Sequence, residues 1–117
     1  MIVGIGIDIV DIKRFKVFCK NQPFLDKCFS GEEKSLNTES LAARFAAKEA
    51  LYKALADKAL FRWEDIKIVT NPNGSPEFRF LGAIRVYAKS MKIHISLSHE
   101  RDTAIAFVII EKPSDSN

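Results

Sequence analysis

Residues 44–55, RFAAKEALYKAL, lie in the middle of a segment from Ser40 to Ala56 in which nearly every residue favours a helix. No glycine or proline interrupts this segment, and Ser40 is suited to be its N-cap. At about 100° per residue, the apolar side chains cover most of the circumference of such a helix. We therefore predict a long central helix that is largely buried.

Two charged pairs lie on this predicted helix. Arg44 and Lys48 stand four residues apart, and so do Glu49 and Lys53. The second pair has a simple interpretation as a helix-stabilising ion pair worth about 0.2–0.5 kcal/mol. It also has a functional interpretation, in which Glu49 binds a metal and Lys53 binds a phosphate. The helix alone does not decide between the two.

Composition and charge limit the possible classes of protein. A chain of 117 residues with 47% hydrophobic and 28% charged residues is typical of one globular domain. The net charge of +3 suits an acidic partner without indicating nucleic acid. Cys19 and Cys28 match no zinc spacing, so we expect a reduced, cytoplasmic setting. The start of the chain lacks the basic region of a signal peptide, and the longest apolar run, 104–110, is too short to span a membrane.

Residues 2–10, IVGIGIDIV, predict a strand with two different faces. One face carries isoleucines at positions 5, 7 and 9, whereas the other carries Gly4, Gly6 and Asp8. Glycine and aspartate are unfavourable in strands, so the second face is suited to close approach by another element or by a ligand. Asp11 can cap the following helix, which leaves Asp8 either as a strand-end residue or as a functional one.

Residues 11–20 predict a short helix with a buried face and a basic face. The residues expected to point inward are Ile12, Phe15, Phe18 and Cys19. Those expected to point outward are Lys13, Arg14, Lys16 and Lys20. Such a basic stripe is usually a solvated surface, but it also suits the docking of an acidic helix.

The rest of the chain predicts a series of short elements. They are a helical turn at 24–29, a Ser30–Glu33 capping box, a hairpin of strands 63–70 and 78–80, a helix at 81–91, and strands at 92–98 and 103–110. The last strand is almost continuously apolar, which is typical of a central position in a sheet. We expect a single domain over residues 1–112 and a frayed tail over residues 113–117.

Asp8, the charges of the long helix and Ser98-His99 at a strand end together suggest a site. Two carboxylates without a zinc-type set of ligands favour a hard cation such as Mg²⁺, which binds carboxylates, phosphates and water. Lysine, arginine and histidine nearby favour phosphate recognition. There is no glycine-rich nucleotide-binding loop of the Walker type.

Three blocks, GIGIDIV at 4–10, RFAAKEA at 44–50 and SLSH at 96–99, resemble the signature blocks of bacterial holo-[acyl-carrier-protein] synthases, the small class of 4′-phosphopantetheinyl transferases. The resemblance covers the chain up to its tail. It implies an α+β fold of the 4′-phosphopantetheinyl transferase type, with a mainly antiparallel sheet packed on the long helix. It also implies a homotrimer with active sites between subunits. The implied reaction transfers 4′-phosphopantetheine from coenzyme A to a serine of acyl carrier protein and releases adenosine 3′,5′-bisphosphate, for fatty acid biosynthesis.

The resemblance also implies roles for individual residues. Asp8 and Glu49 would hold Mg²⁺ and would act in catalysis together with Lys53. The residues expected to bind coenzyme A are Arg44, Lys48, Lys53, Ser98 and His99. The residues expected to receive the carrier protein are Lys13, Arg14, Lys16 and Lys20, with Arg14 ranked first. The proton acceptor for the serine stays open between Asp8, Glu49 and a water on the metal.

One segment departs from the family pattern. A glycine-rich turn usually follows the lysine that corresponds to Lys53, whereas residues 54–60 here read ALADKAL. Two other classes remain as alternatives. One is a small basic binding module without catalytic activity, and the other is a Mg²⁺-dependent phosphatase or nuclease with paired carboxylates.

Overall fold

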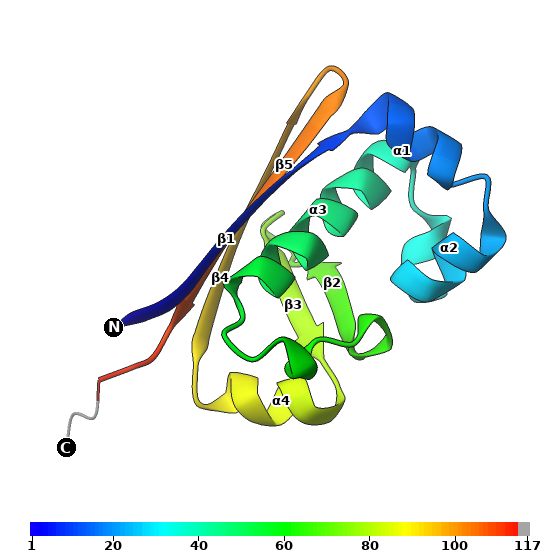
Figure 1. Ribbon diagram of the computed structural model, residues 1–117. Coiled ribbons are helices and arrows are strands. Elements are labelled where there is room, and N and C mark those ends of the chain that lie inside the picture. Colours follow the sequence, from blue (N-terminus) through cyan, green and yellow to red (C-terminus); the bar gives the residue numbers. More distant parts are fainter. Residues whose placement is uncertain (115–117) are drawn as a thin grey trace.

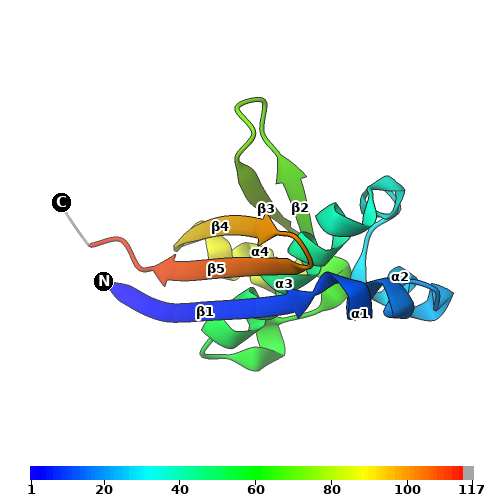
Figure 2. The same cartoon turned by 90° about the horizontal axis from the view of Figure 1, so that it is seen from above.

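A long helix, α3 (Thr38–Ala54), lies along one face of a three-stranded antiparallel sheet in this computed structural model, which describes residues 1–114 (Figure 1). The order of the strands is β1 (Ile2–Asp11), β5 (Thr103–Glu111) and β4 (Lys92–Glu100), so β5 is central, as its apolar sequence predicts. A second antiparallel pair, β2 (Ile66–Thr70) and β3 (Pro76–Phe80), projects beside this sheet (Figure 2). The predicted α+β class, with an antiparallel sheet on a long helix, is confirmed.

The short elements connect these two sheets to the helix. They are α1 (Ile12–Phe18), α2 (Gln22–Cys28), α4 (Gly82–Lys89) and three 3-10 turns at Glu33–Ser35, Lys58–Leu60 and Trp63–Asp65. The buried apolar residues form one connected cluster around α3, and alanines make up much of the surface of α3 that enters it. The small alanine side chains allow the helix to approach the sheet closely.

Two glycines of β1 allow backbone contact between strand and helix. A Cβ atom built on Gly6 would lie 1.8 Å from the carbonyl oxygen of Ala50, and one built on Gly4 would lie 2.0 Å from that of Ala54. No side chain fits into either space, so these positions require glycine. The glycine face of β1 is therefore a packing face, and the element that approaches it is α3.

The opposite face of the sheet is not covered within one chain. Its apolar side chains, each 37–66% exposed, are Ile5, Ile7, Ile9, Ile105 and Phe107. On the central strand the residues alternate with the buried Ala104, Ala106, Val108 and Ile110, which face α3. An uncovered sheet face of this apolar character is typical of an interface.

A buried carboxylate joins the second sheet to α3. The Nζ of Lys48 lies 2.8 Å from Oε1 of Glu33, and both side chains are almost fully buried. The other oxygen of Glu33 accepts a hydrogen bond of 3.3 Å from the backbone N–H of Ile68, whose carbonyl accepts one of 3.4 Å from Arg44 Nε. Glu33 and Arg44 thus bond the free edge of β2 as a neighbouring strand would.

Some sequence-based predictions need correction. The N-cap of α3 is Asn37 and not Ser40, because the Asn37 side chain accepts a 2.8 Å hydrogen bond from the backbone N–H of Ser40. The strand predicted from residue 63 begins at Ile66, after a 3-10 turn. Phe18, expected to point inward, is half exposed. The Ser30–Glu33 capping box forms as predicted, although it opens only a 3-10 turn. Of the predicted tail, residues 115–117 lie outside the described residues.

The contact between β1 and α3 leads to a direct test. Gly6→Ala forces a methyl group against the Ala50 carbonyl and should lower the melting temperature by at least about 10 °C, since overpacking of this kind costs 1–3 kcal/mol or more. Gly31→Ala is the matched control, because a Cβ at Gly31 has no atom within 4 Å. Equal melting temperatures of Gly6→Ala and the wild type would contradict the close approach of the two backbones.

Candidate active site

Asp8 and Lys53 form an ion pair between β1 and the last turn of α3. The Nζ of Lys53 lies 3.0 Å from Oδ1 of Asp8 and donates a second hydrogen bond of 3.0 Å to the carbonyl of Ile7. The Asp8 side chain is only 15% exposed, whereas that of Lys53 is 52% exposed. Asp8 continues the glycine face of β1, so the close packing of this face brings its carboxylate to the helix.

Glu49 lies one helical turn before Lys53 and shares a hollow of about 400 Å³ with Asp8. Burial raises the pKa of Glu49 and the nearby carboxylate of Asp8 raises it further, while Lys53 and Lys27 act in the opposite direction. Two carboxylates therefore face the same space and repel each other there. The predicted convergence of Asp8 and Glu49 is a feature of this fold.

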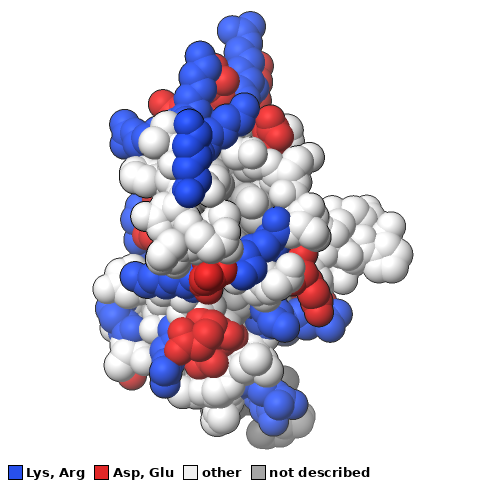
Figure 3. All heavy atoms as spheres, turned by 90° about the vertical axis from the view of Figure 1, so that its right-hand side faces the viewer, with Lys and Arg blue, Asp and Glu red and all other residues white. Residues whose placement is uncertain are grey.

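The rest of this hollow is apolar apart from Arg14 on α1 and Asp11, whose side chain caps the start of α1. Its aromatic lining consists of Phe15, Phe18, Phe24 and Phe45. Of the three basic residues of α1, Lys13, Arg14 and Lys16, Arg14 is the one that lines the hollow. Lys13, Lys16 and Lys20 are exposed beside it, and Figure 3 shows Lys and Arg side chains gathered at this end of the molecule.

The carboxylate pair is suited to a divalent cation that takes its remaining ligands from elsewhere. Within residues 1–114, no group of three or more His, Cys, Asp or Glu side chains has the arrangement of a metal site. Of the carboxylates that line the hollow, Asp11 is engaged in capping α1, so Asp8 and Glu49 are the two that can hold an ion. Mg²⁺ is commonly bound in this way, by one or two carboxylates together with substrate phosphates and water. The residues present fit that ion.

Arg44 and Lys48 lie on another side of α3. Arg44 donates a 3.1 Å hydrogen bond to Thr70 and lines a second hollow, of about 290 Å³, between α3 and β2. Lys48 is fully buried, and its ammonium group is held by Glu33 and by the carbonyl of Cys28 at 2.7 Å. This position corrects the expectation that Lys48 binds coenzyme A, because no surface of Lys48 is accessible to a ligand.

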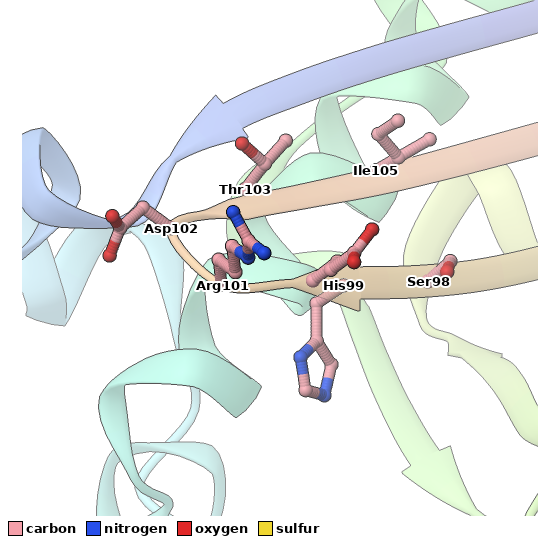
Figure 4. Close-up of a pocket in the computed structure, with 7 residues that line it drawn as sticks. Ser98, His99, Arg101, Asp102, Thr103 and Ile105 are labelled. Atoms are coloured by element: carbon pink, nitrogen blue, oxygen red, sulfur yellow. The ribbon is translucent and has the colours of Figure 1, made fainter.

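Ser98 and His99 line a third hollow, of about 620 Å³, where β4 turns into β5 (Figure 4). The two side chains alternate across the sheet. Ser98 pairs with Ile105 on the open face, whereas His99 pairs with the buried Ala104 and points away from Ile105. The tip of this hairpin is held at the start of α1, since the Ile12 N–H donates to the Asp102 carbonyl at 2.7 Å.

Sequence reasoning missed two parts of this arrangement. Glu33 was expected only in a capping box, although a buried lysine such as Lys48 requires an acidic partner. A hollow of about 220 Å³ beside Glu49, lined by Tyr52, Phe61 and Trp63, was also missed. It depends on edge-to-face contacts between rings that are well separated in the chain, such as Tyr52 and Phe61 at 5.3 Å.

A paired carboxylate and lysine, between a glycine-bearing strand and a long helix of an α+β fold, define a class of site suited to a cation and an anionic ligand. Residues 4–108 match the model of the 4′-phosphopantetheinyl transferase superfamily, and the chain belongs to this family. The resemblance seen in the sequence is thereby confirmed.

Individual relatives agree with this assignment. A holo-[acyl-carrier-protein] synthase of Clavibacter sepedonicus is 44% identical over 115 residues, which cover 95% of this chain and 97% of the relative. The structure of an acyl carrier protein synthase of Mycobacterium tuberculosis matches with a TM-score of 0.77 at 39% identity, covering 97% of this chain and 100% of that one. A holo-(acyl-carrier-protein) synthase of Bacillus anthracis, in complex with CoA (3′,5′-ADP), matches with a TM-score of 0.79 at 31% identity over 97% and 99% of the two chains.

The raised pKa of Glu49 predicts that this residue opposes folding at neutral pH. Its folded-state pKa lies above the unfolded value of 4.5, so its ionised form weakens the fold above the folded pKa and has no such effect below pH 4.5. With EDTA present, Glu49→Gln should raise the melting temperature at pH 7.5 by about 2–5 °C and leave it unchanged at pH 4. Glu39→Gln, in the first turn of the same helix, should give no gain at either pH. A lower melting temperature of Glu49→Gln at pH 7.5 would contradict this assignment.

Proposed function

We propose that this chain transfers 4′-phosphopantetheine from coenzyme A to a serine hydroxyl of acyl carrier protein, for fatty acid biosynthesis. The observation that carries the proposal is the convergence of Asp8, Glu49 and Lys53 at one site in a member of this family. The curated relative is named for this synthase activity, and the Bacillus anthracis relative is in complex with CoA (3′,5′-ADP).

In the proposed reaction, the serine oxygen forms a bond to the phosphorus next to pantetheine. The bond from that phosphorus to the bridging oxygen breaks, and adenosine 3′,5′-bisphosphate leaves with the electron pair. Lys53 stabilises the negative charge on the departing phosphate, and Asp8 holds its ammonium group in place. The acceptor of the serine proton stays open between Asp8, Glu49 and a water of the site.

Asp8 and Glu49 are the residues that would hold Mg²⁺. When bound, the ion neutralises charge on the diphosphate and makes it easier for the serine oxygen to approach. The pair is well suited to this, because both carboxylates face one hollow and the repulsion between them is relieved by a cation.

Mass spectrometry of an apo carrier protein incubated with the chain, coenzyme A and Mg²⁺ tests this function. We expect the carrier to gain the mass of phosphopantetheine, and EDTA to prevent the gain. Asp8→Asn should lower the rate by at least about 100-fold, because the negative charge that binds the metal and pairs with Lys53 is lost. Asp26→Asn, at an exposed aspartate of α2, is the matched control and should leave the rate unchanged.

Each failure has a distinct meaning. No mass gain with the wild type would refute the transferase function. Hydrolysis of model phosphodiesters without a carrier would then favour a phosphatase or nuclease, and salt-sensitive binding of nucleic acid would favour a binding module. Near-normal transfer by Asp8→Asn would refute the metal assignment alone.

We also propose a homotrimer in which neighbouring copies complete each site. The open sheet face is apolar and uncovered within one chain, which suits burial against another copy. The hollows around Asp8 and Glu49, around Arg44, and around Ser98 and His99 share no lining residue. We infer that one coenzyme A reaches all three groups by taking residues from more than one chain.

Subunit complementation tests the shared site. Asp8→Asn and His99→Ala chains should each be nearly inactive alone, whereas a mixture that exchanges subunits should regain about a quarter of wild-type activity, because a quarter of the neighbouring pairs combine two intact halves. Mixing Asp8→Asn with Glu49→Gln is the control and should regain nothing, since both residues line the same hollow of one chain. Equal activity in the two mixtures would contradict a site shared between chains.

The basic face of α1 is the proposed docking surface for the acidic carrier protein. Lys13, Arg14 and Lys16 are exposed on α1, Lys20 is exposed in the turn after it, and the apolar Val17 and Phe18 are exposed as well. A mixture of positive charge and exposed apolar side chains suits an acidic amphipathic helix. Arg14 also lines the hollow of the two carboxylates, so a partner bound to this face would present its serine at the site.

Two further features bear on the cellular setting. None of the helices within residues 1–114 has the length and apolar character needed to cross a bilayer. Both cysteines are free thiols. The cytoplasmic location stays a prediction from the sequence.

A further inference from the structure

The side chain of Lys58, in the turn that follows α3, contacts the C-terminal end of this helix. The Asp57 side chain accepts a 3.0 Å hydrogen bond from the backbone N–H of Ala59 and so begins the 3-10 turn that carries Lys58. The Lys58 ammonium group then donates to the carbonyls of Tyr52, at 2.6 Å, and Lys53, at 3.1 Å. It also lies 5.0 Å from the centre of the Tyr52 ring.

These two carbonyls belong to the negative end of the helix. The last four carbonyls of a helix lack helical partners, and the aligned peptide dipoles give this end about half a negative elementary charge. In α3 the Leu51 carbonyl is bonded by the N–H of Leu55, so Lys58 takes the next two. An ammonium group at this place both satisfies the carbonyls and compensates the charge.

Helix ends are often closed by a left-handed glycine, but no glycine follows Lys53 until Gly74. The C-cap residue, Leu55, has φ −74° and ψ 127°, which is an extended conformation. Lys58 therefore does through its side chain what a glycine motif does through the backbone.

The side chain of Lys53 projects from the same last turn of α3. Anions usually bind at the positive ends of helices, whereas Lys53 would bind a phosphate beside a negative one. The Lys53 ammonium group is the phosphate ligand of the proposed function, and its own carbonyl is one of the two that Lys58 holds.

We propose that Lys58 is a positioning residue for coenzyme A binding, and this inference rests on the proposed function. It fixes the last turn of α3, so that Lys53 stays directed at Asp8, and it cancels the negative helix end that would repel the diphosphate. A role in helix stability alone would lower the melting temperature without changing affinity for coenzyme A.

Steady-state transfer kinetics of four proteins test the proposal: wild type, Lys58→Gln, Lys58→Arg and Lys89→Gln. Glutamine still donates hydrogen bonds to carbonyls but has no charge, so Lys58→Gln should fold. We expect Lys58→Gln to raise the KM for coenzyme A about 3- to 10-fold at low salt and to change kcat less than twofold. The difference should shrink as salt screens the charges. Lys58→Arg keeps the charge and the donors, so its KM should stay within about twofold of wild type.

Lys89→Gln removes an exposed lysine from the last turn of α4 and should leave the KM unchanged. Equal KM values for Lys58→Gln and wild type at low salt would overturn the inference. Equal impairment of Lys58→Gln and Lys58→Arg would overturn it as well, because the effect would then not depend on charge. Both results require transfer by the wild type, so they are distinct from a failure of the proposed function, in which the wild type itself is inactive.

Discussion

The contact between the backbones of β1 and α3 is the constraint on which the rest of the molecule depends. Gly4 and Gly6 leave no room for a side chain beneath the helix, so the carbonyls of Ala54 and Ala50 lie directly against the strand. At this separation, Asp8 on the strand reaches Lys53 on the helix at 3.0 Å. A thicker interface, with ordinary side chains between the elements, would separate the acidic group from the basic one.

The charged side chains of α3 lie on two different sides of the helix. Glu49 and Lys53 face β1, whereas Arg44 and Lys48 face the second sheet through Glu33. Burial lowers the pKa of Lys48 and Glu33 opposes this effect, so the buried pair is a structural joint between α3, β2 and the preceding turn. One helix thus carries Glu49 and Lys53 at the hollow shared with Asp8, and Lys48 in a buried structural pair. Arg44 and Lys48 have the same spacing as Glu49 and Lys53, so only the surroundings of each side chain distinguish their roles.

The open face of the sheet is the physical basis of the proposed assembly. A single chain buries the alanines and branched residues of β5 against α3 but leaves the isoleucines of β1 exposed on the other side. Ser98 faces this open side, while Asp8 faces the helix. Within one chain the sheet separates Ser98 from Asp8, which supports the proposed sharing of the site between neighbouring copies.

Much of this protein was determined by the sequence itself. The uninterrupted run of helix formers predicted α3, the alternation at 92–98 predicted β4, and the continuous apolar run at 103–110 predicted the central strand. The three blocks indicated the family and singled out Asp8 and Glu49. These features are local, because helix propensity, side-chain alternation and short motifs are properties of neighbouring residues.

Only the tertiary structure decided which charged side chains are accessible to a ligand and which faces of the sheet are covered by other elements. The spacing on α3 could not show that Lys48 is buried beside Glu33, because that pair joins residues 15 positions apart through a turn. Nor could it show that the glycine face of β1 packs while its isoleucine face stays open, or that Lys58 closes the end of α3. These outcomes depend on how closely β1, the segment after α3 and the second sheet pack against the helix. Such packing involves segments that are distant in the sequence, so no single segment predicts it.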